Sequence, residues 1–421
     1  MKKFLSNYKS SLTLLIAIII GGIAGVVFGT KTSVIQPLGD LFLNLMFMMI
    51  VPLVFFSIAA IANMGGMQRL GRIMGSIVIV FLGTAIISAL LAFIGTSIVN
   101  PLEGTDTSAI KSLMEQAEKP ETSLENISVL GQLVNTFTVS DFSLLLSRSN
   151  MLQLIVFSVL FGLATALAGE VAKPVAAFLT GETAVMMKMV KMVMYYAPIG
   201  LGAYFAAVIG QLGPHILEGY ARGFVLYLLL TLVYYFGFFT LYAYLAGRSE
   251  GVKIFWKNAF TPSITAIATC SSAASIPANL ESTRKMGVPK DIAETVIPLG
   301  ANMHKDGSVF GGVLKIVFLF TLFGKDVTSP SNILSIIAVS FLVGAVMGAI
   351  PGGGMIGEML ILSIFGFPPS VLPIIAVIST IIDAPATLLN STGNTVCAMM
   401  VTRLVEGENW LKRSISRSEI V

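Results

Sequence analysis

Charged residues are scarce in this sequence, and their scarcity excludes most ordinary folds. They make up 11% of the 421 residues, whereas apolar residues make up 55%. The charged share is roughly half that of a typical soluble domain. A chain with so few charges cannot cover a surface that faces water, so a water-soluble fold is not expected.

Histidine and cysteine are also rare, with two residues of each. Neither the histidines nor the cysteines have the spacing of a metal site, and no base lies beside a candidate nucleophile. The sequence therefore predicts neither an enzyme nor a cofactor. Cys270 and Cys397 lie in apolar stretches, where we interpret them as small apolar residues and not as a disulfide.

The basic residues lie at the chain ends and in short loops, not in one stripe. With a net charge of only +4, this pattern does not indicate nucleic-acid binding. It does predict an orientation in a cell (inner) membrane, because Lys and Arg gather in cytoplasmic loops. We place both termini on that side with the following set: Lys2, Lys3, Lys9, Arg69, Arg72, Arg248, Lys253, Lys412, Arg413 and Arg417.

Six apolar runs in the first 250 residues approach or exceed the length that crosses a bilayer, about 20 residues. They cover 11–28, 38–62, 73–99, 151–167, 192–209 and 224–245. The first run leads directly into further runs and lacks a clear cleavage signature, so we interpret it as a transmembrane helix. The acidic stretch 103–125 is typical of a mobile loop on the opposite side of the membrane.

After about residue 250 the apolar runs become shorter and are interrupted by Gly, Pro, Ser and Asn. Two predicted hairpins, with tips at 270–277 and 351–354, are each followed by a helix with a polar break, at 304–308 and 390–394. Backbone freed from a helix at membrane depth survives where it lines a buried cavity, and paired breaks in two repeats indicate a transport site. The alternative is that these residues only kink packed helices.

Four charged residues lie among apolar neighbours in this half: Lys305, Asp306, Glu358 and Asp383. An ionised side chain at the bilayer centre costs about 2.5–3.5 kcal/mol or more, so each needs a partner or a function. Unwinding at Gly307 would let Lys305 and Asp306 share one polar site, as a structural ion pair or as a cation-coupling site. Glu358 is either an ion or proton site or a residue that faces water.

Steps of three or four residues place Asp383, Thr387, Asn390 and Asn394 on one helical face. A carboxylate, a hydroxyl and amides in one stripe suit a zwitterion. The same stripe would also suit a polar interface between two helices.

Together these features resemble the sodium-coupled dicarboxylate and amino-acid symporters, the family of the glutamate transporters, over nearly the whole chain. In that family the first hairpin tip is serine-rich and ends in Pro, as 270–277 does, and the second has Pro before small residues, as 351–354 does. The family's seventh helix breaks at Asn-Met-Asp-Gly-Thr, which 304–308 matches in part. The eighth-helix positions are Asp383, Ala386, Thr387, Asn390 and Asn394.

The resemblance implies an all-α membrane protein with about eight transmembrane helices, two re-entrant hairpins and inverted repeats. It also implies a homotrimer with an elevator mechanism. Scaffold helices 1 and 2 would cover 1–72, transport helix 3 would cover 73–100, and an extracellular loop with the start of helix 4 would cover 101–150. Scaffold helices 4 and 5 with transport helix 6 would cover 151–250. The transport core and a cytoplasmic tail would cover 251–421.

The resemblance further implies a substrate site. Asp383 would take an α-amino group, Thr387, Asn390, Ser271 and Ser272 would hold the α-carboxylate, and Ser308 would lie near the substrate side chain. Pro351 and Gly352 belong to the second tip. Ala386 replaces the arginine that pairs with acidic substrates, so we expect a neutral amino acid. The alternative is an acidic amino acid or a C4-dicarboxylate, with Lys305 replacing that arginine.

The family's sodium sites correspond to His304, Asp306, Phe81, Thr84, Ala85 and Asn394. Several oxygen ligands are missing there, and hard cations require oxygen. We therefore expect little or no sodium dependence, with Lys305 as a built-in cation beside Asp306 or with proton coupling, for which His304 and Glu358 are candidates. An ion channel fits less well, because no pore filter is recognisable.

Overall fold

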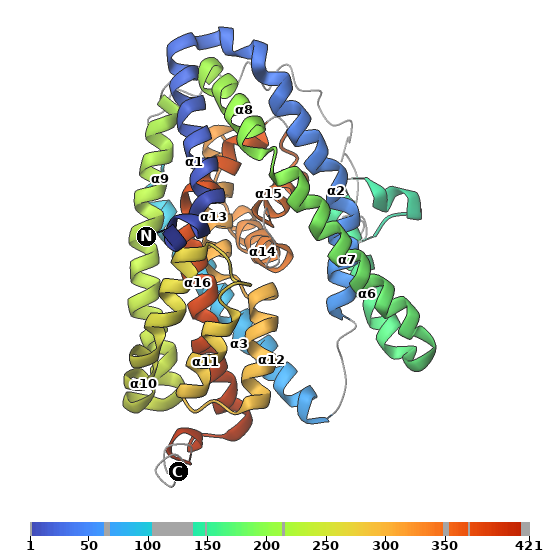
Figure 1. The fold of residues 1–421 in the computed structure, drawn as a ribbon, viewed down its shortest axis with the longest axis vertical. Helices are drawn as coiled ribbons and strands as arrows, with labels where there is room; N and C mark the ends of the chain where they lie inside the picture. The colour runs from blue at the N-terminus through green and yellow to red at the C-terminus, as the bar shows by residue number, and fades with distance from the viewer. Residues whose placement is uncertain are drawn as a thin grey trace.

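The computed structural model describes residues 2–62, 68–102, 138–147, 150–212, 215–347, 353–368 and 371–413. Within these ranges the regular structure is helical, with no strand (Figure 1). This confirms the predicted all-α class. Helices suit so apolar a chain, because each backbone N–H and C=O within them is bonded inside the segment.

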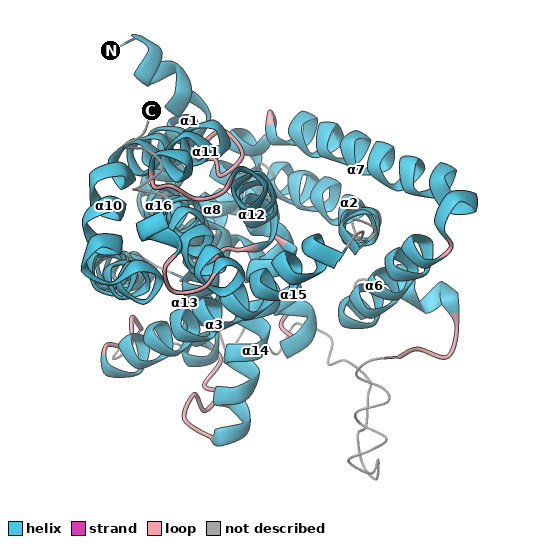
Figure 2. Cartoon of the chain, turned by 90° about the horizontal axis from the view of Figure 1, so that it is seen from below, coloured by secondary structure: helices cyan, strands magenta, loops and turns pink. Residues whose placement is uncertain are grey.

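The first half contains α1, α2, α3, α6, α7 and α8. Their bounds, with three intervening 3₁₀ turns, are α1 Lys2–Phe28, η1 Gly29–Ile35, α2 Gln36–Ala62, α3 Gln68–Ile98, η2 Phe142–Leu146, α6 Met151–Leu167, η4 Gly169–Ala172, α7 Lys173–Met194 and α8 Ala197–Leu212. Helices α2, α6 and α7 pack on one another along one side of the molecule (Figures 1 and 2). Helix α8 connects this side to the rest, because it packs against both α1 and α2.

The second half forms one packed body together with α3. Its elements are α9 His215–Leu232, the π-helical turn η5 Val233–Phe238, α10 Phe239–Thr269, α11 Ile276–Lys285, α12 Lys290–Met303, α13 Asp306–Leu322, α14 Pro330–Val346, α15 Gly353–Phe365 and α16 Leu372–Glu406. Helix α16 is central, since it contacts α10, α11, α12, α13 and α15. Helix α3 packs against α13, α14 and α16, on the side away from α6 and α7 (Figure 2).

Four described stretches are long and apolar enough to cross a membrane: Ile16–Phe42, Arg72–Ile98, Leu217–Thr269 and Leu372–Glu406. The hairpin arms are shorter. At 1.5 Å per residue, α11 with 10 residues and α15 with 13 residues reach only about 15 and 20 Å, less than the roughly 30 Å of a hydrocarbon core. Long spans and short hairpin arms therefore coexist in one chain.

The predicted break at 390–394 is wrong, because α16 runs without interruption from Leu372 to Glu406. Its polar residues bind neighbouring helices: Asn279 of α11 donates to Ser391, and the hydroxyls of Ser263 and Thr392 lie 3.0 Å apart. Gly393 lies against the rings of Phe239 and His304. Close packing and contacts between helices, not unwinding, explain these residue types.

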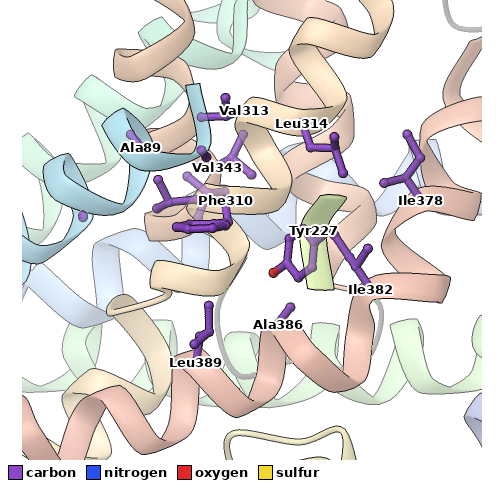
Figure 3. Close-up of a cluster of buried hydrophobic side chains, with 14 of the residues drawn as sticks. Ala89, Tyr227, Phe310, Val313, Leu314, Val343, Ile378, Ile382, Ala386 and Leu389 are labelled. Atoms are coloured by element: carbon purple, nitrogen blue, oxygen red, sulfur yellow. The ribbon is translucent and has the colours of Figure 1, made fainter. Parts of the chain in front are cut away.

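Helices α13 and α16 approach closely where the polar site begins. A Cβ on Gly307 would lie 2.4 Å from the carbonyl oxygen of Ala386, so only glycine allows this approach. Beyond it, apolar side chains from α3, α9, α13, α14 and α16 meet in one cluster (Figure 3). The labelled members are Ala89, Tyr227, Phe310, Val313, Leu314, Val343, Ile378, Ile382, Ala386 and Leu389. This cluster fixes the helices that carry the site.

Candidate functional site

Two interruptions of helix geometry meet at the site. Helix α12 ends at Met303, His304 is extended, Lys305 is neither helical nor extended, and α13 begins at Asp306. The predicted break is therefore present but covers only 304–305, because Gly307 and Ser308 are helical and not unwound. Helix α10 ends at Cys270, whose φ of 47° is left-handed, and α11 begins at Ile276. A contact between Lys305 and Ser272 brings the segments that precede α13 and α11 into the same region.

Lys305 binds the first hairpin. Its Nζ donates to Ser272 Oγ at 2.9 Å, and Asp383 of α16 lies in the same region, without an ion pair to Lys305. Asp383 accepts a long hydrogen bond from Thr387, at 3.4 Å, and one from the Cys270 thiol. An ammonium, a carboxylate and hydroxyls from three elements therefore form one cluster, which we call the lysine cluster.

The other predicted substrate residues lie around the lysine cluster. Ser308 N donates to Asn390 Oδ1 at 3.2 Å, and Asn390 Nδ2 donates to Ser308 Oγ at 3.1 Å. Ser271 Oγ accepts from Ala274 N and closes the hairpin turn. Ala386 contacts Gly307. Pro351 and Gly352 lie outside the described residues.

His304 is the centre of a second polar group, the histidine cluster. Its Nε2 lies 2.8 Å from Thr84 Oγ1 and 3.1 Å from Asp306 Oδ1, and its Nδ1 lies 3.0 Å from Asn394 Oδ1. The ring of Phe81 stacks on the imidazole at 4.4 Å between centroids. The imidazole and the Asp306 carboxylate are each 1% exposed, so the cluster is closed to solvent.

Tyrosine and serine hydroxyls that the sequence analysis missed complete the histidine cluster. Tyr234 OH donates to Asp306 Oδ2 at 2.9 Å, Ser88 Oγ donates to the Asp306 carbonyl at 2.7 Å, and Tyr227 OH donates to the Gly307 carbonyl at 2.7 Å. These residues lie in apolar runs of distant helices, where a tyrosine or serine is ordinary. No local pattern distinguishes them.

The structure differs from the predicted pairing of Lys305 with Asp306. Lys305 contacts Ser272, whereas Asp306 contacts His304 and Tyr234. The physical reason is that Lys305 lies outside the helix while Asp306 already starts α13, so adjacent side chains point apart. The basic side chain beside Asp306 is the imidazole of His304.

Glu358 belongs to a third group, with a partner that the sequence analysis overlooked. Lys315 Nζ lies 3.4 Å from Glu358 Oε1 and donates to Ser379 Oγ at 2.8 Å, and Ser379 donates to Glu358. Both charged side chains are at most 2% exposed, so Glu358 does not face water. Lys315 sits alone in an apolar run, which is the signal that could have found it.

Comparison with known proteins decides the class. The model of the sodium:dicarboxylate symporter family matches residues 11–404. This chain belongs to the sodium:dicarboxylate symporter family. Members of the family are transporters and not enzymes, and the several apolar helices described above agree with a multi-pass membrane protein.

Curated members of the family align over nearly the full chain. The chain is 29% identical to a proton/sodium-glutamate symport protein of Bacillus caldotenax, with 92% of each covered. It is 26% identical to a proton/glutamate-aspartate symporter of Bacillus subtilis, with 93% of each covered. It is also 26% identical to C4-dicarboxylate transport protein 1 of Mesorhizobium japonicum, with 95% of this chain and 83% of that protein covered.

Proposed function

We propose that this protein carries a small anionic carboxylate across the membrane together with protons and does not require sodium. Related family members are named for glutamate, aspartate and C4-dicarboxylates. They favour the alternative over the neutral amino acid that the missing arginine at Ala386 predicted. In that alternative Lys305 replaces the missing arginine, and its ammonium lies beside Ser272 in the lysine cluster, where it would supply the cation for an anionic substrate.

The observation that carries the proposal is the position of His304. Its imidazole lies between Thr84, Asp306 and Asn394, three residues that the resemblance assigns to the family's sodium sites. A hard cation needs several oxygen atoms around it, and here the ring occupies the space between them. A symporter still needs a coupling ion; one of the relatives is named for protons and sodium, and another for protons without sodium.

We also propose that the chain divides into a transport part, which moves, and a scaffold. The transport part would comprise α3, α9–α10 and the helices that surround α16, with α10–α11 and α14–α15 as re-entrant hairpins. The scaffold would comprise α1, α2 and α6–α8, in a homotrimer with an elevator-type movement and cytoplasmic termini. Support comes from packing: α3 contacts α13 and α16, whereas α2 contacts α6 and α7.

Thermal unfolding of the purified protein tests the proposal. Glutamate, aspartate, succinate and fumarate would each be added in sodium and in choline. A ligand at about 100 times its dissociation constant adds about 2.7 kcal/mol, so we expect at least one carboxylate to stabilise the protein equally in both salts. Stabilisation in sodium only, or by none of the four, would contradict the proposal.

A variant of His304 tests the cause. His304→Asn replaces the ring by a smaller amide, whose oxygen can bind a cation, and opens space beside Asp306. We therefore expect sodium to increase carboxylate binding in this variant. His215→Asn, at the only other histidine, is the matched control and should remain indifferent to sodium. A His304→Asn protein that still ignores sodium would show that the imidazole is not what excludes the ion.

A further inference from the structure

Three side chains from three helices contact one another in the transport core, and we call them the Glu358 cluster. They are Lys315 of α13, Glu358 of α15 and Ser379 of α16. Lys315 Nζ lies 3.4 Å from Glu358 Oε1 and donates to Ser379 Oγ at 2.8 Å, while Ser379 Oγ donates to Glu358 Oε1. Each side chain therefore contacts the other two, and α15 is bound to α13 and α16 at one point.

The Glu358 cluster is closed to solvent. The side chain of Lys315 is 2% exposed and that of Glu358 is 0% exposed. Movement of α15 away from α13 would separate a buried ammonium from a buried carboxylate, and each charge would then lack compensation. The ion pair therefore favours the arrangement in which α15 is packed on α13. Neither charged side chain is placed to contact a substrate.

The Glu358 cluster lies one helical turn from the predicted substrate residue Asp383. Ser379 precedes Asp383 by four residues in α16, so the two lie on the same helical face. The second hairpin meets this face, because a Cβ on Gly354 would lie 3.4 Å from Ser379 Oγ. Gly354 belongs to the predicted tip and lies one turn before Glu358 in α15. The cluster thus fixes the start of α15 beside the predicted substrate face.

The two arms of the second hairpin also pack closely on one another. A Cβ on Gly357 would lie 2.7 Å from Val343 Cγ1 and 3.0 Å from Met347 Cγ, so glycine allows α15 to approach α14 at this point. Because the arms are in such close contact, holding α15 at Glu358 also restrains α14.

We infer that Lys315, Glu358 and Ser379 are positioning residues, which hold the second hairpin on α16 and thereby set the affinity for the carboxylate without contacting it. This inference rests on the proposed carboxylate transport and deepens it. When only one arrangement of a protein is competent to bind, the apparent affinity falls with the fraction of molecules in that arrangement. Loss of the cluster should therefore weaken binding even in a protein that remains folded.

Hydrogen–deuterium exchange of the purified protein, measured by mass spectrometry, tests the position of the hairpin. The variant is Lys315→Met with Glu358→Met, which removes both charges and leaves neither one buried alone. We expect the amides of 353–365 to exchange at least ten-fold faster than in the wild type, because local opening of α15 becomes easier. Glu281→Met with Lys285→Met removes an ion pair whose side chains are 64% and 61% exposed. This control should keep the wild-type exchange in 353–365.

Calorimetric titration in choline with glutamate, aspartate, succinate and fumarate tests the consequence for binding. We expect every carboxylate that binds the wild type to bind at least ten-fold more weakly to the double variant of Lys315 and Glu358. The control variant should bind with wild-type affinity. Thermal unfolding of the same samples shows whether each variant is folded, and a purely structural role would lower the unfolding temperature without changing the affinity of the folded protein.

The outcomes separate the inference from the proposed function. Wild-type exchange in 353–365 of the double variant overturns the inference, and this result requires no ligand. Faster exchange with unchanged affinity also overturns it. If the double variant does not fold, Ser379→Ala leaves both charges in place and is measured in the same two ways, with the same expected directions, and no change in either overturns the inference. If none of the four carboxylates binds the wild type, the proposed function falls and the inference falls with it.

Discussion

His304, Lys305 and Asp306 are consecutive, yet their side chains enter two separate clusters. His304 and Asp306 meet in the histidine cluster, while Lys305 reaches Ser272 of the first hairpin. The sequence allowed us to identify all three as functional candidates, because charges are expensive in an apolar run. It did not reveal their partners, since the directions of the side chains depend on how the backbone leaves α12 and enters α13.

Tyr234 provides a prediction at the scale of one residue. Its hydroxyl donates to Asp306 Oδ2 and to the Thr84 carbonyl, and the side chain is fully buried. Tyr234→Phe removes both donations and leaves buried acceptors, which costs about 1–3 kcal/mol. We expect thermal unfolding in detergent to shift to lower temperature.

The control for this prediction is Tyr195→Phe, at a tyrosine that is 75% exposed. It should leave the unfolding temperature nearly unchanged. Equal unfolding temperatures for Tyr234→Phe and the wild type would show that the hydroxyl contributes nothing to the histidine cluster.

At the scale of elements, Gly, Pro and polar residues predicted one break correctly and another wrongly. The break between α12 and α13 is real, whereas α16 continues through Asn390 and Gly393. Both segments, 304–308 and 390–394, contain a glycine and a serine among polar residues. What separates them is packing, because Gly393 lies against two rings and Ser391 binds Asn279 of α11. Single-sequence patterns do not contain that information.

Lys315 and Glu358 supply a prediction about elements, because they join α13 to α15. Removing one member of a buried ion pair leaves an uncompensated charge, at a cost of about 3–5 kcal/mol. We expect Lys315→Met to lower the unfolding temperature strongly. The double variant Lys315→Met with Glu358→Met should recover much of the loss, since no charge remains buried.

Measuring both single variants and the double variant by thermal unfolding gives a complete cycle. Additive losses, with the double variant least stable, would show that the two charges do not compensate one another. Lys325→Met is a suitable control, since this lysine lies near the end of α13 and its ammonium contacts the Phe365 carbonyl instead of a carboxylate.

At the scale of the whole molecule, composition and the pattern of breaks predicted the membrane class, the all-α fold and the family. The sequence revealed only some of the acidic and basic residues that contact one another in the core. Asp306, Asp383, Lys305 and Glu358 stood out as charges, while Lys315 and the role of the His304 ring became clear only from three-dimensional contacts. In this core Asp306 and Glu358 each lie beside a basic side chain of the protein itself.

Uptake of labelled succinate into proteoliposomes tests this claim most directly. An inward proton gradient with choline on both sides would be compared with an inward sodium gradient at equal pH. Because the imidazole of His304 lies beside Asp306 and the ammonium of Lys305 lies at the first hairpin, we predict that the proton gradient drives accumulation and that the sodium gradient does not. Accumulation that requires the sodium gradient would contradict the account.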